Sequence, residues 1–369
     1  MLQNTICKIC KSEVVDLSSA PWTMQEFFAG SGLVAYGLKG MFAPVWANDI
    51  SEQKAAVYEA NFGNEYFELG DIKDVKGASL PAAHLSWASF PCQDLSLAGS
   101  LGGIHASRSG LVWEWLRILD EMSDKPKILL LENVSGLLST NGGNNYRTLH
   151  MALVDRGYRC GAIVLNASYF VPQSRPRVFI IAVQRDCRIP NELVGSGPCW
   201  LHSRVASDLG RSLPDWIWWK TERPPHRQKC LKDIIEDAPF DKDHVLKLIP
   251  TRHREKLDKH EIVYATGYRR TRHGEQQLEL RFDGIAGCLR TPEGGSSKQY
   301  LVVKKNGETH ARLLTVREAA RLMGAPDSFL LPGSYNDGYK AMGDAVAMPV
   351  ARFLGEQFLT KIAEAVYND

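Results

Sequence analysis

The chain has 369 residues, of which 44% are hydrophobic and 23% are charged, and its formal net charge is +2. This composition is typical of a soluble globular protein, and the length exceeds one ordinary core, so we expect two lobes. No apolar run is long enough to span a membrane, and residues 1–20 lack a signal-peptide pattern, which argues against membrane and secreted classes. Eight cysteines without the layout of a small secreted domain indicate a reducing cytoplasm.

The first twenty residues contain the pair Cys7 and Cys10. A lone C-x-x-C pair lacks the second pair of ligands that a closed tetrahedral zinc site needs. We expect residues 1–20 to be a leader segment, with zinc binding as the alternative. No metal site is expected elsewhere, because four further candidate ligands follow no regular spacing: Cys187, Cys199, His202 and Cys230.

A glycine-rich turn follows the first expected strand, residues 23–28, and precedes a helical pattern. Gly30 and Gly32 fit the spacing G-x-G-x-x-G/A. Glycines let the backbone approach a ligand closely, and the start of a helix offers free amide donors. The alternative is a turn that is glycine-rich only because it is tight.

Two acids follow the next two expected strands. Residues 44–47 lead to Asp49, and residues 66–69 lead to Asp71. An acid about 20 residues after the glycines is where the ribose hydroxyls of a nucleotide-type cofactor are held. Each acid could instead cap a helix or lie in a solvated loop. The turn and the two acids in this order favour an adenosyl-binding site.

A proline follows the next expected strand, residues 84–88, and a cysteine comes directly after it. Open α/β sheets place their chemistry at the carboxyl ends of parallel strands. Pro91 stiffens the loop because its ring fixes φ. Cys92 is therefore a candidate nucleophile, and the alternative is a buried structural cysteine. The glycine-rich segment 98–110 is expected to form a mobile lid.

A carboxylate ends the strand expected at residues 128–131. Glu132 would lie at the same sheet edge as Cys92, which makes it a candidate acid partner, although an ordinary loop acid is the alternative. The helical spacing of residues 111–122 predicts a core helix before this strand.

Two arginines precede a further apolar strand, residues 178–183. Arg175 and Arg177 stand at alternate positions of an extended segment, so they project to the same side. That arrangement suits binding of a phosphate or a base carbonyl. A solvated surface is the alternative. A helix at 146–156 and a strand at 160–165 are expected before them.

The middle of the chain combines aromatic and basic residues from about residue 185. Tryptophans cluster at 216–219, and arginines follow, most densely at 269–272. This mixture suits a phosphate backbone and base edges, whereas the alternative is a solvated basic surface over a local tryptophan core. The loop 287–297 could hold a phosphate through its amides or serve as a hinge.

The tail is expected to be helical. Thr315 and Glu318 form a capping box, which predicts a helix from 315 to 323. Residues 344–366 have helical spacing and are expected to pack back on the first lobe, so that lobe would be discontinuous in sequence.

Taken in order, these motifs resemble those of bacterial-type cytosine-5 DNA methyltransferases. The first, second and third motifs correspond to 28–32, 48–49 and 70–72, and the most specific are P-C-Q (91–93), E-N-V (132–134) and Q-x-R-x-R (173–177). The motifs near the end are 312–322 and 343–350. The match covers nearly everything outside residues 1–20 and about 185–285. The sequence departs from the family pattern at five positions: Glu26, Leu33, Asp49, Ser89 and Asp344.

The resemblance implies an α/β fold, a Rossmann-like S-adenosylmethionine-dependent methyltransferase sheet with helices on both faces, plus a smaller irregular target-recognition domain. Residues 21–184 and 312–369 would form the catalytic and cofactor-binding domain, and residues 185–311 the target-recognition domain and hinge. The implied partner is double-stranded DNA, bound by a monomer in the cytoplasm, where DNA would associate it with the nucleoid. The commonest setting of the family pairs the enzyme with a cognate restriction endonuclease.

The resemblance also implies a mechanism. Cys92 would attack C6 of an extruded cytosine, Glu132 would protonate or hydrogen-bond N3, and Arg175 and Arg177 would hold O2 and the flanking phosphate. The implied DNA-binding residues are Gln93, Ser96, Arg269, Arg270, Arg272 and Arg290. The implied cofactor-binding residues are Phe28, Ala29, Gly30, Ser31, Gly32, Leu33, Asp49, Ile50, Asp71, Ile72, Pro91, Leu111, Asp344, Ala345 and Val346.

Three rival functions compete with this interpretation. A transfer-RNA cytosine-5 methyltransferase would keep the same catalytic set, but the long basic insertion argues for duplex DNA. A catalytically silent DNA-binding protein could share the fold, although retention of Cys92, Glu132, Arg175 and Arg177 argues against it. A nicotinamide oxidoreductase explains the first glycine turn and nothing after Cys92.

Overall fold

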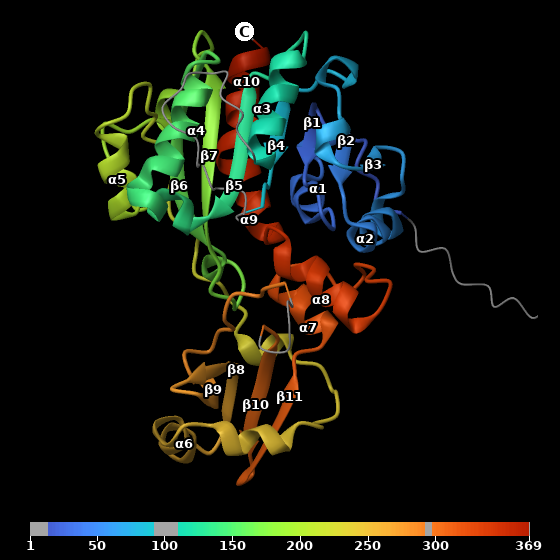
Figure 1. Ribbon diagram of the computed structural model, residues 1–369, viewed down its shortest axis with the longest axis vertical. Helices are drawn as coiled ribbons and strands as arrows, with labels where there is room; N and C mark the ends of the chain where they lie inside the picture. The colour runs from blue at the N-terminus through green and yellow to red at the C-terminus, as the bar shows by residue number, and fades with distance from the viewer. Residues whose placement is uncertain (1–13, 92–109, 292–296, 369) are drawn as a thin grey trace, which may run out of the picture.

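The computed structural model describes residues 14–91, 110–291 and 297–368, and it contains two β-sheets (Figure 1). The larger sheet has seven strands in the order β3-β2-β1-β4-β5-β7-β6. Strand β7 runs antiparallel to both of its neighbours, and the other pairs are parallel. Its strands are β1 (Trp22–Phe27), β2 (Phe42–Asp49), β3 (Phe67–Leu69), β4 (Leu85–Ala88), β5 (Ile128–Val134), β6 (Tyr158–Asn166) and β7 (Pro176–Gln184).

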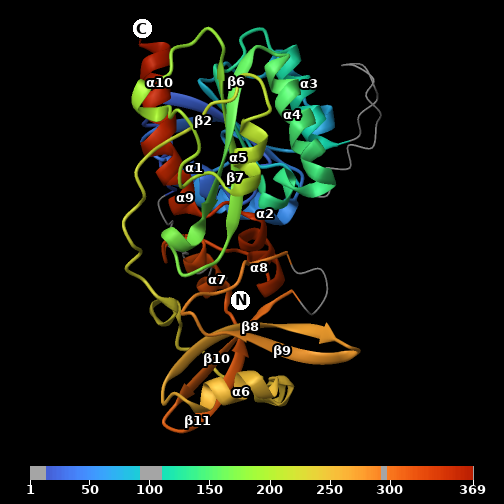
Figure 2. The same ribbon diagram turned by 90° about the vertical axis from the view of Figure 1, so that its left-hand side faces the viewer.

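Helices cover both faces of the large sheet (Figure 2). The strands are apolar on both sides: along β5, Ile128 and Leu130 join one core, whereas Leu129 and Leu131 join the other. This continuous apolar run is typical of a strand buried on both faces. The predicted α/β sheet with helices on both faces is confirmed. One face carries α1 (Leu33–Leu38), α2 (Glu52–Phe62), α9 (Met348–Leu354) and α10 (Thr360–Tyr367), and the other carries α3 (Leu111–Glu121), α4 (Asn144–Val154) and α5 (Arg204–Gly210).

The smaller sheet has four antiparallel strands in the order β11-β10-β8-β9 and its own apolar core. Two tight hairpins connect its strands. Their turns place His273 and Gly274, and Asn306 and Gly307, at positive φ, as a type I′ turn requires. Its elements are α6 (Thr251–Asp258), β8 (Val263–Arg272), β9 (Glu275–Arg281), β10 (Gln299–Lys305) and β11 (Glu308–Leu313).

The C-terminal part of the chain connects the two sheets and then returns to the larger one. Helices α7 (Val316–Leu322) and α8 (Tyr335–Asp344) lie between the sheets (Figure 1). The predicted capping box of Thr315 and Glu318 is confirmed. Helix α9 packs so closely on α1 that a Cβ at Gly37 would lie 2.7 Å from the Met348 carbonyl oxygen. The predicted return of the tail to the first lobe is therefore confirmed.

Residues 191–219 differ from the predicted division of the chain, because they pack on the larger sheet. Cys160 in β6 forms an isolated bridge with Trp216, and Trp219 donates its indole N–H to the Ile181 carbonyl of β7 at 3.2 Å. The tryptophans, which the alternative interpretation assigned to a local core of the basic segment, thus extend the core of the large sheet. Among the residues that the structure describes, no helix is both long and apolar enough to cross a membrane.

Candidate active site

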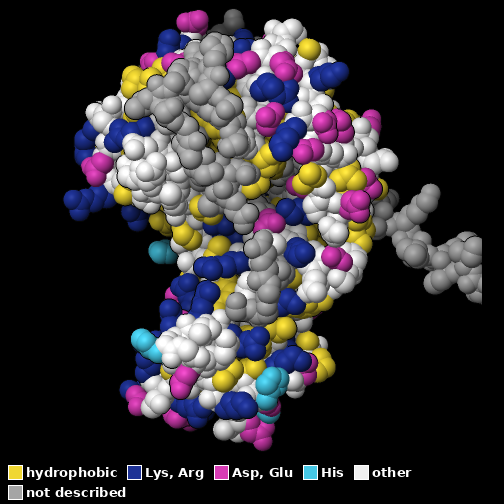
Figure 3. Space-filling view, in the orientation of Figure 1, with side chains coloured by type: hydrophobic (Ala, Val, Ile, Leu, Met, Phe, Trp, Pro, Cys, Tyr) yellow, Lys and Arg dark blue, Asp and Glu magenta, His cyan; other side chains and the backbone are white. Residues whose placement is uncertain are grey.

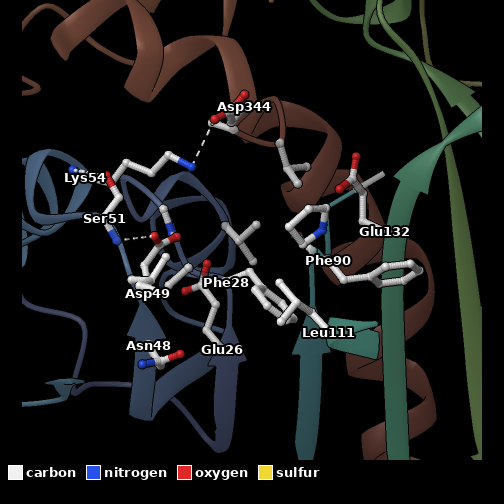
Figure 4. A pocket seen from close by; sticks show the side chains of 18 of the residues that line it. Glu26, Phe28, Asn48, Asp49, Ser51, Lys54, Phe90, Leu111, Glu132 and Asp344 are labelled. Carbon is white, nitrogen blue, oxygen red and sulfur yellow. Dashed lines mark hydrogen bonds and ion pairs between the residues drawn. The ribbon is translucent and has the colours of Figure 1, made fainter. Parts of the chain in front are cut away.

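A cavity of about 690 Å³ opens at the edge of the large sheet where β1, β2, β4 and β5 end (Figure 4). The strand order reverses here, since β2 and β4 lie on opposite sides of β1. Open α/β sheets bind ligands at such a point. The predicted site residues that line the cavity are Phe28, Ala29, Gly30, Leu33, Asp49, Ile50, Asp71, Ile72, Pro91, Leu111, Glu132, Arg175, Arg177, Asp344, Ala345 and Val346.

Two residues of the predicted glycine loop lie behind the cavity wall. The Ser31 hydroxyl donates to the Ala341 carbonyl at 3.4 Å. Gly32 has φ 78°, and a Cβ there would lie 2.3 Å from a ring carbon of Phe62. Ser31 therefore contacts α8 and Gly32 contacts α2, so both residues hold the loop in place and neither faces the cavity.

Substitution of Gly32 by alanine is expected to lower the free energy of unfolding by about 2–4 kcal/mol, because the methyl group adds a clash to a left-handed backbone. Gly40 provides the control, since its φ is 79° and no described atom lies within 4 Å of its Cβ position. Gly40→Ala should cost only the backbone strain of about 1 kcal/mol. Urea denaturation measures both values, and equal losses would contradict the clash.

The two predicted cofactor acids already hold the backbone around the cavity. Asp49 accepts the Gly30 amide on Oδ2 and the Ser51 amide on Oδ1, both at 2.9 Å. Asp71 accepts the Lys73 amide on Oδ1 at 3.0 Å and so caps a short helix. The capping alternative and the ligand prediction are compatible, because each carboxylate oxygen has two lone pairs. Ile50, which is 66% exposed, presents an apolar side chain at the cavity.

Three charged residues in the cavity wall were not predicted as site residues: Glu26, Lys54 and Lys73. Burial, and then the charge of Asp49, raise the pKa of Glu26 to about 8. Lys54 of α2 forms an ion pair with Asp344 across the cavity, with 3.0 Å between Nζ and Oδ2 (Figure 4). Glu26 could have been predicted as a site residue, because it is an acid that closely precedes the glycine loop. Lys54 belongs to no motif, so the sequence offered no signal for it.

The loop that leads to the predicted nucleophile begins beside Glu132. The Asn133 side chain donates to the Phe90 carbonyl at 2.8 Å, which joins the end of β5 to the chain leaving β4. The predicted residues Cys92, Gln93 and Ser96, and the predicted lid, lie outside the residues that the structure describes, except for Gly110. Their roles stay predictions.

Glu132 and Arg177 form a buried ion pair at this edge, with 3.0 Å between Oε1 and Nε. Arg177 reaches Glu132 because β7 is antiparallel, so the start of β7 lies beside the end of β5. Burial raises the pKa of Glu132 above its ordinary value, although Arg177 and Arg175 oppose the shift. The carboxyl group is therefore poised to carry a proton nearer to neutral pH than an exposed glutamate.

Arg175 holds three separate segments together. Its Nη1 donates to the Leu289 carbonyl at 2.9 Å, and its Nη2 donates to the carbonyls of Gly343 and Ala345 at 2.9 and 2.7 Å. The side chain is buried, and burial lowers its pKa to about 10. This geometry assigns Arg175 a positioning role, and direct contact with a substrate stays a prediction.

A thiol that sequence reasoning missed, Cys288, lies at the arginine pair. Its Sγ lies 3.4 Å from Nη1 of Arg175 and 3.8 Å from Nη1 of Arg177. The shared sulfur contact confirms that the two arginines project to the same side. Burial raises the pKa of this thiol, but the two arginines outweigh burial, and the pKa lies below its ordinary value.

Arg175→Lys is expected to lower the free energy of unfolding by about 1–3 kcal/mol, because an ammonium group cannot span three carbonyls and leaves buried acceptors unpaired. Arg185→Lys is the control: this half-exposed arginine pairs with Asp215 on the surface, and its change should stay within about 0.5 kcal/mol. Thermal denaturation followed by circular dichroism measures both. An Arg175→Lys protein of unchanged stability that has lost activity would instead support direct substrate contact.

A family model described as C-5 cytosine-specific DNA methylase matches residues 22–360. The chain belongs to this family. It is accordingly an enzyme of the DNA (cytosine-5-)-methyltransferase class, as the motifs predicted.

Curated relatives of this C-5 cytosine-specific DNA methylase match along nearly their whole length. The type II methyltransferase M.HhaI of Haemophilus parahaemolyticus is 30% identical over 331 residues, covering 89% of this chain and 91% of the relative. The type II methyltransferase M.Bsp6I of Bacillus sp. (strain RFL6) is 28% identical over 350 residues, covering 93% and 98%.

Solved structures share the fold of this methylase at low identity. The Dnmt2 methyltransferase of S. pombe has a TM-score of 0.56 at 18% identity, covering 91% of this chain and 98% of that one. A putative DNA modification methyltransferase from an E. coli prophage has a TM-score of 0.57 at 19% identity, covering 94% and 100%. At these identities the likeness concerns the fold alone.

Basic side chains of this methylase gather in the region between the two sheets and on the smaller sheet (Figure 3). The guanidinium groups of Arg270 and Arg290 lie 4.8 and 5.9 Å from the ring centre of Tyr268, whose hydroxyl donates to the Cys288 carbonyl. These two predicted DNA-binding residues are therefore connected to the arginine pair of the cavity. Arg269 instead lies over Tyr300, and Arg272 forms an ion pair with Glu279 at 2.7 Å.

Proposed function

We propose that this methylase transfers the methyl group of S-adenosylmethionine to C5 of a cytosine that is flipped out of duplex DNA. The observation that carries the proposal is the buried Glu132–Arg177 pair in the same cavity as the glycine loop. A carboxyl group with a raised pKa, an arginine and an adjoining cysteine-bearing loop are the groups that covalent activation of a pyrimidine needs.

Each residue has a definite task in this proposal. C5 of cytosine is a poor nucleophile, so the Cys92 thiolate attacks C6 and makes C5 enamine-like. Glu132 donates its proton to N3, which neutralises the charge that the attack pushes into the ring. Arg177 orients Glu132 and holds O2, and Arg175 keeps the hinge and the C-terminal segment in place around it. Once C5 has taken up the methyl group, a base removes the C5 proton, Cys92 leaves as the thiolate, and N3 returns its proton to Glu132.

The cavity fits the proposed cofactor, which supplies an electrophilic methyl group when bound. The loop from Phe28 to Leu33 approaches through Gly30, where φ is 59°, and a side chain at that left-handed position would be strained. Asp49 keeps free lone pairs for the ribose hydroxyls, and Asp71 lies near the proposed adenine amine. The apolar side chains of Ile50 and Ile72 would contact the adenine ring.

The proposed substrate is duplex DNA bound between the two sheets. C6 of a stacked cytosine is out of reach, so the base must leave the helix, at a cost of a few kcal/mol. Arg270 and Arg290 are the proposed contacts on the recognition side, with Arg269, Arg272, Gln93 and Ser96 as further candidates. The proposal keeps the division into a catalytic domain (21–184 and 312–369) and a recognition domain (185–311), except that residues 191–219 pack on the catalytic sheet. We also propose that the methylase is a monomer, that it acts in the cytoplasm, and that a cognate restriction endonuclease accompanies it.

The experiment that tests this function offers the purified protein duplex DNA or transfer RNA together with a donor tritiated in its methyl group. We expect label in the 5-methylcytosine of DNA and none in transfer RNA. Label in transfer RNA alone would overturn the choice of substrate, and label in neither would support the silent DNA-binding alternative. Bisulfite sequencing of DNA from expressing cells would then give the target sequence.

A further inference from the structure

Lys54 and Asp344 face each other at the cavity from opposite ends of the chain. Lys54 is on α2, which follows the second strand, and Asp344 is the last residue of α8. Their charged atoms are 3.0 Å apart, and both side chains line the cavity (Figure 4). The pair therefore places one cation and one anion side by side at the wall of the proposed cofactor site.

The surroundings keep both charges in place. Burial lowers the pKa of Lys54, but Asp49 and Asp344 outweigh it, so the pKa lies above its ordinary value and the ammonium stays charged. The side chain of Lys54 also passes the glycine loop, since its Cδ lies 3.9 Å from the Cβ position of Gly30. Asp344 accepts the hydroxyl of Thr291 on its other oxygen, which fixes the orientation of the carboxylate.

The other charged residues of the cavity wall have separate positions or partners. Arg177 is bonded to Glu132, and the terminal nitrogens of Arg175 donate to carbonyls. Lys73 is exposed and follows Asp71, at the end of the cavity proposed for adenine. Lys54 is thus the lysine of the described wall that lies beside the glycine loop.

We propose that Lys54 and Asp344 together bind the amino-acid end of the cofactor, an inference that rests on the proposed function. That end is a zwitterion whose carboxylate and ammonium are attached to one carbon, so it is complementary to an adjacent cation and anion. Lys54 Nζ donates to the carboxylate, and Asp344 Oδ2 accepts from the ammonium. The existing ion pair opens to admit the zwitterion, and each protein charge exchanges one partner for another.

Two ligands separate this role from a structural ion pair. S-adenosylhomocysteine keeps the carboxylate and the ammonium, whereas its decarboxylated analogue keeps only the ammonium. Lys54→Met is expected to weaken binding of S-adenosylhomocysteine by about 10–100-fold, the range for loss of a charge-assisted hydrogen bond. Binding of the decarboxylated analogue should change by less than about threefold. Isothermal titration calorimetry of wild type and variant measures all four affinities.

Further variants make the test decisive. Lys54→Arg should retain the preference for the carboxylate ligand, and Lys73→Met, a change to another lysine of the same cavity, should leave that preference unaltered. Asp344→Asn should weaken both ligands by the same factor, because both keep the ammonium. Equal weakening of the two ligands by Lys54→Met, or no weakening, would overturn the inference. Failure of the wild type to bind either ligand would instead overturn the proposed cofactor.

Discussion

Replacement of Glu132 by glutamine is expected to lower the rate of methyl transfer by about 10²–10⁴-fold, the range for loss of a general acid. The carboxyl group is buried, bonded to Arg177 and raised in pKa, so it can hold the proton that N3 of cytosine needs. Glutamine keeps the shape and can donate a hydrogen bond, but it cannot transfer a proton. Affinity for the cofactor should change by less than about threefold, since Glu132 lies at the far side of the cavity from Asp49 (Figure 4).

Single-turnover methylation of duplex DNA measures the rate, and titration with S-adenosylhomocysteine measures the affinity. Glu59→Gln is the matched control, because Glu59 is exposed on α2 and its change should leave both quantities at wild-type values. A Glu132→Gln protein that binds the cofactor poorly but turns over at the normal rate once saturated would show that Glu132 is not the acid.

Much of the lining of the cavity could be predicted, because its signals are local in sequence. The parallel strands β1, β2, β3 and β5 all end at one edge of the sheet, so the residues at or just after their carboxyl ends must lie there. Gly30, Asp49, Asp71 and Glu132 hold such positions, and all line one cavity. The strand bounds differ from the expected ones by a few residues, as for β2, which extends on both sides of 44–47.

The contacts of the arginine pair could not be predicted, because they depend on segments distant in sequence. Arg175 bonds carbonyls that lie 114 to 170 residues further along the chain. Carbonyls carry no side-chain signature, so a motif can name the arginine and still leave its partners unknown. For the same reason, the sequence did not indicate that Cys288 lies at the arginine pair. Its lowered pKa comes from two arginines of β7 and the chain before it, and nothing in its own neighbourhood indicates this.

The tryptophan cluster at 216–219 shows how composition misled the division into domains. Aromatic residues next to basic ones suit a nucleic-acid surface, yet Trp219 is buried and its indole bonds β7. Strand β6 lies at the edge of the large sheet, and the segment 191–219 packs against its outer side. Arg204 and Arg211 are exposed within this segment, but most arginines of the predicted basic region lie further on, in the smaller sheet and its connections.

Cys92→Ser is expected to abolish methyl transfer, with a rate at least 10³-fold below wild type, while the affinity for duplex DNA stays within about threefold. A serine hydroxyl is far less acidic than a thiol, so it would not attack C6 at neutral pH. The start of the loop is held beside Glu132 by the bond from Asn133 to the Phe90 carbonyl, and that bond does not involve position 92. The Cys92→Ser variant should therefore bind duplex DNA normally but fail to transfer the methyl group.

DNA that contains 5-fluorocytosine measures the chemistry directly. When S-adenosylmethionine is present, C5 takes up the methyl group, but the fluorine at C5 cannot then leave as a proton does. Elimination is blocked, so the sulfur–C6 bond of the wild type persists and a covalent adduct is visible in a denaturing gel. We expect the adduct with the wild type and none with Cys92→Ser. Cys230→Ser is the control, since this thiol bonds Asp233 at 3.1 Å and is absent from the lining of the active-site cavity, and its variant should form the adduct at the wild-type rate. An adduct that survives in Cys92→Ser would assign the nucleophile to another residue, and Cys288, whose pKa the arginine pair already lowers, would be the next thiol to replace.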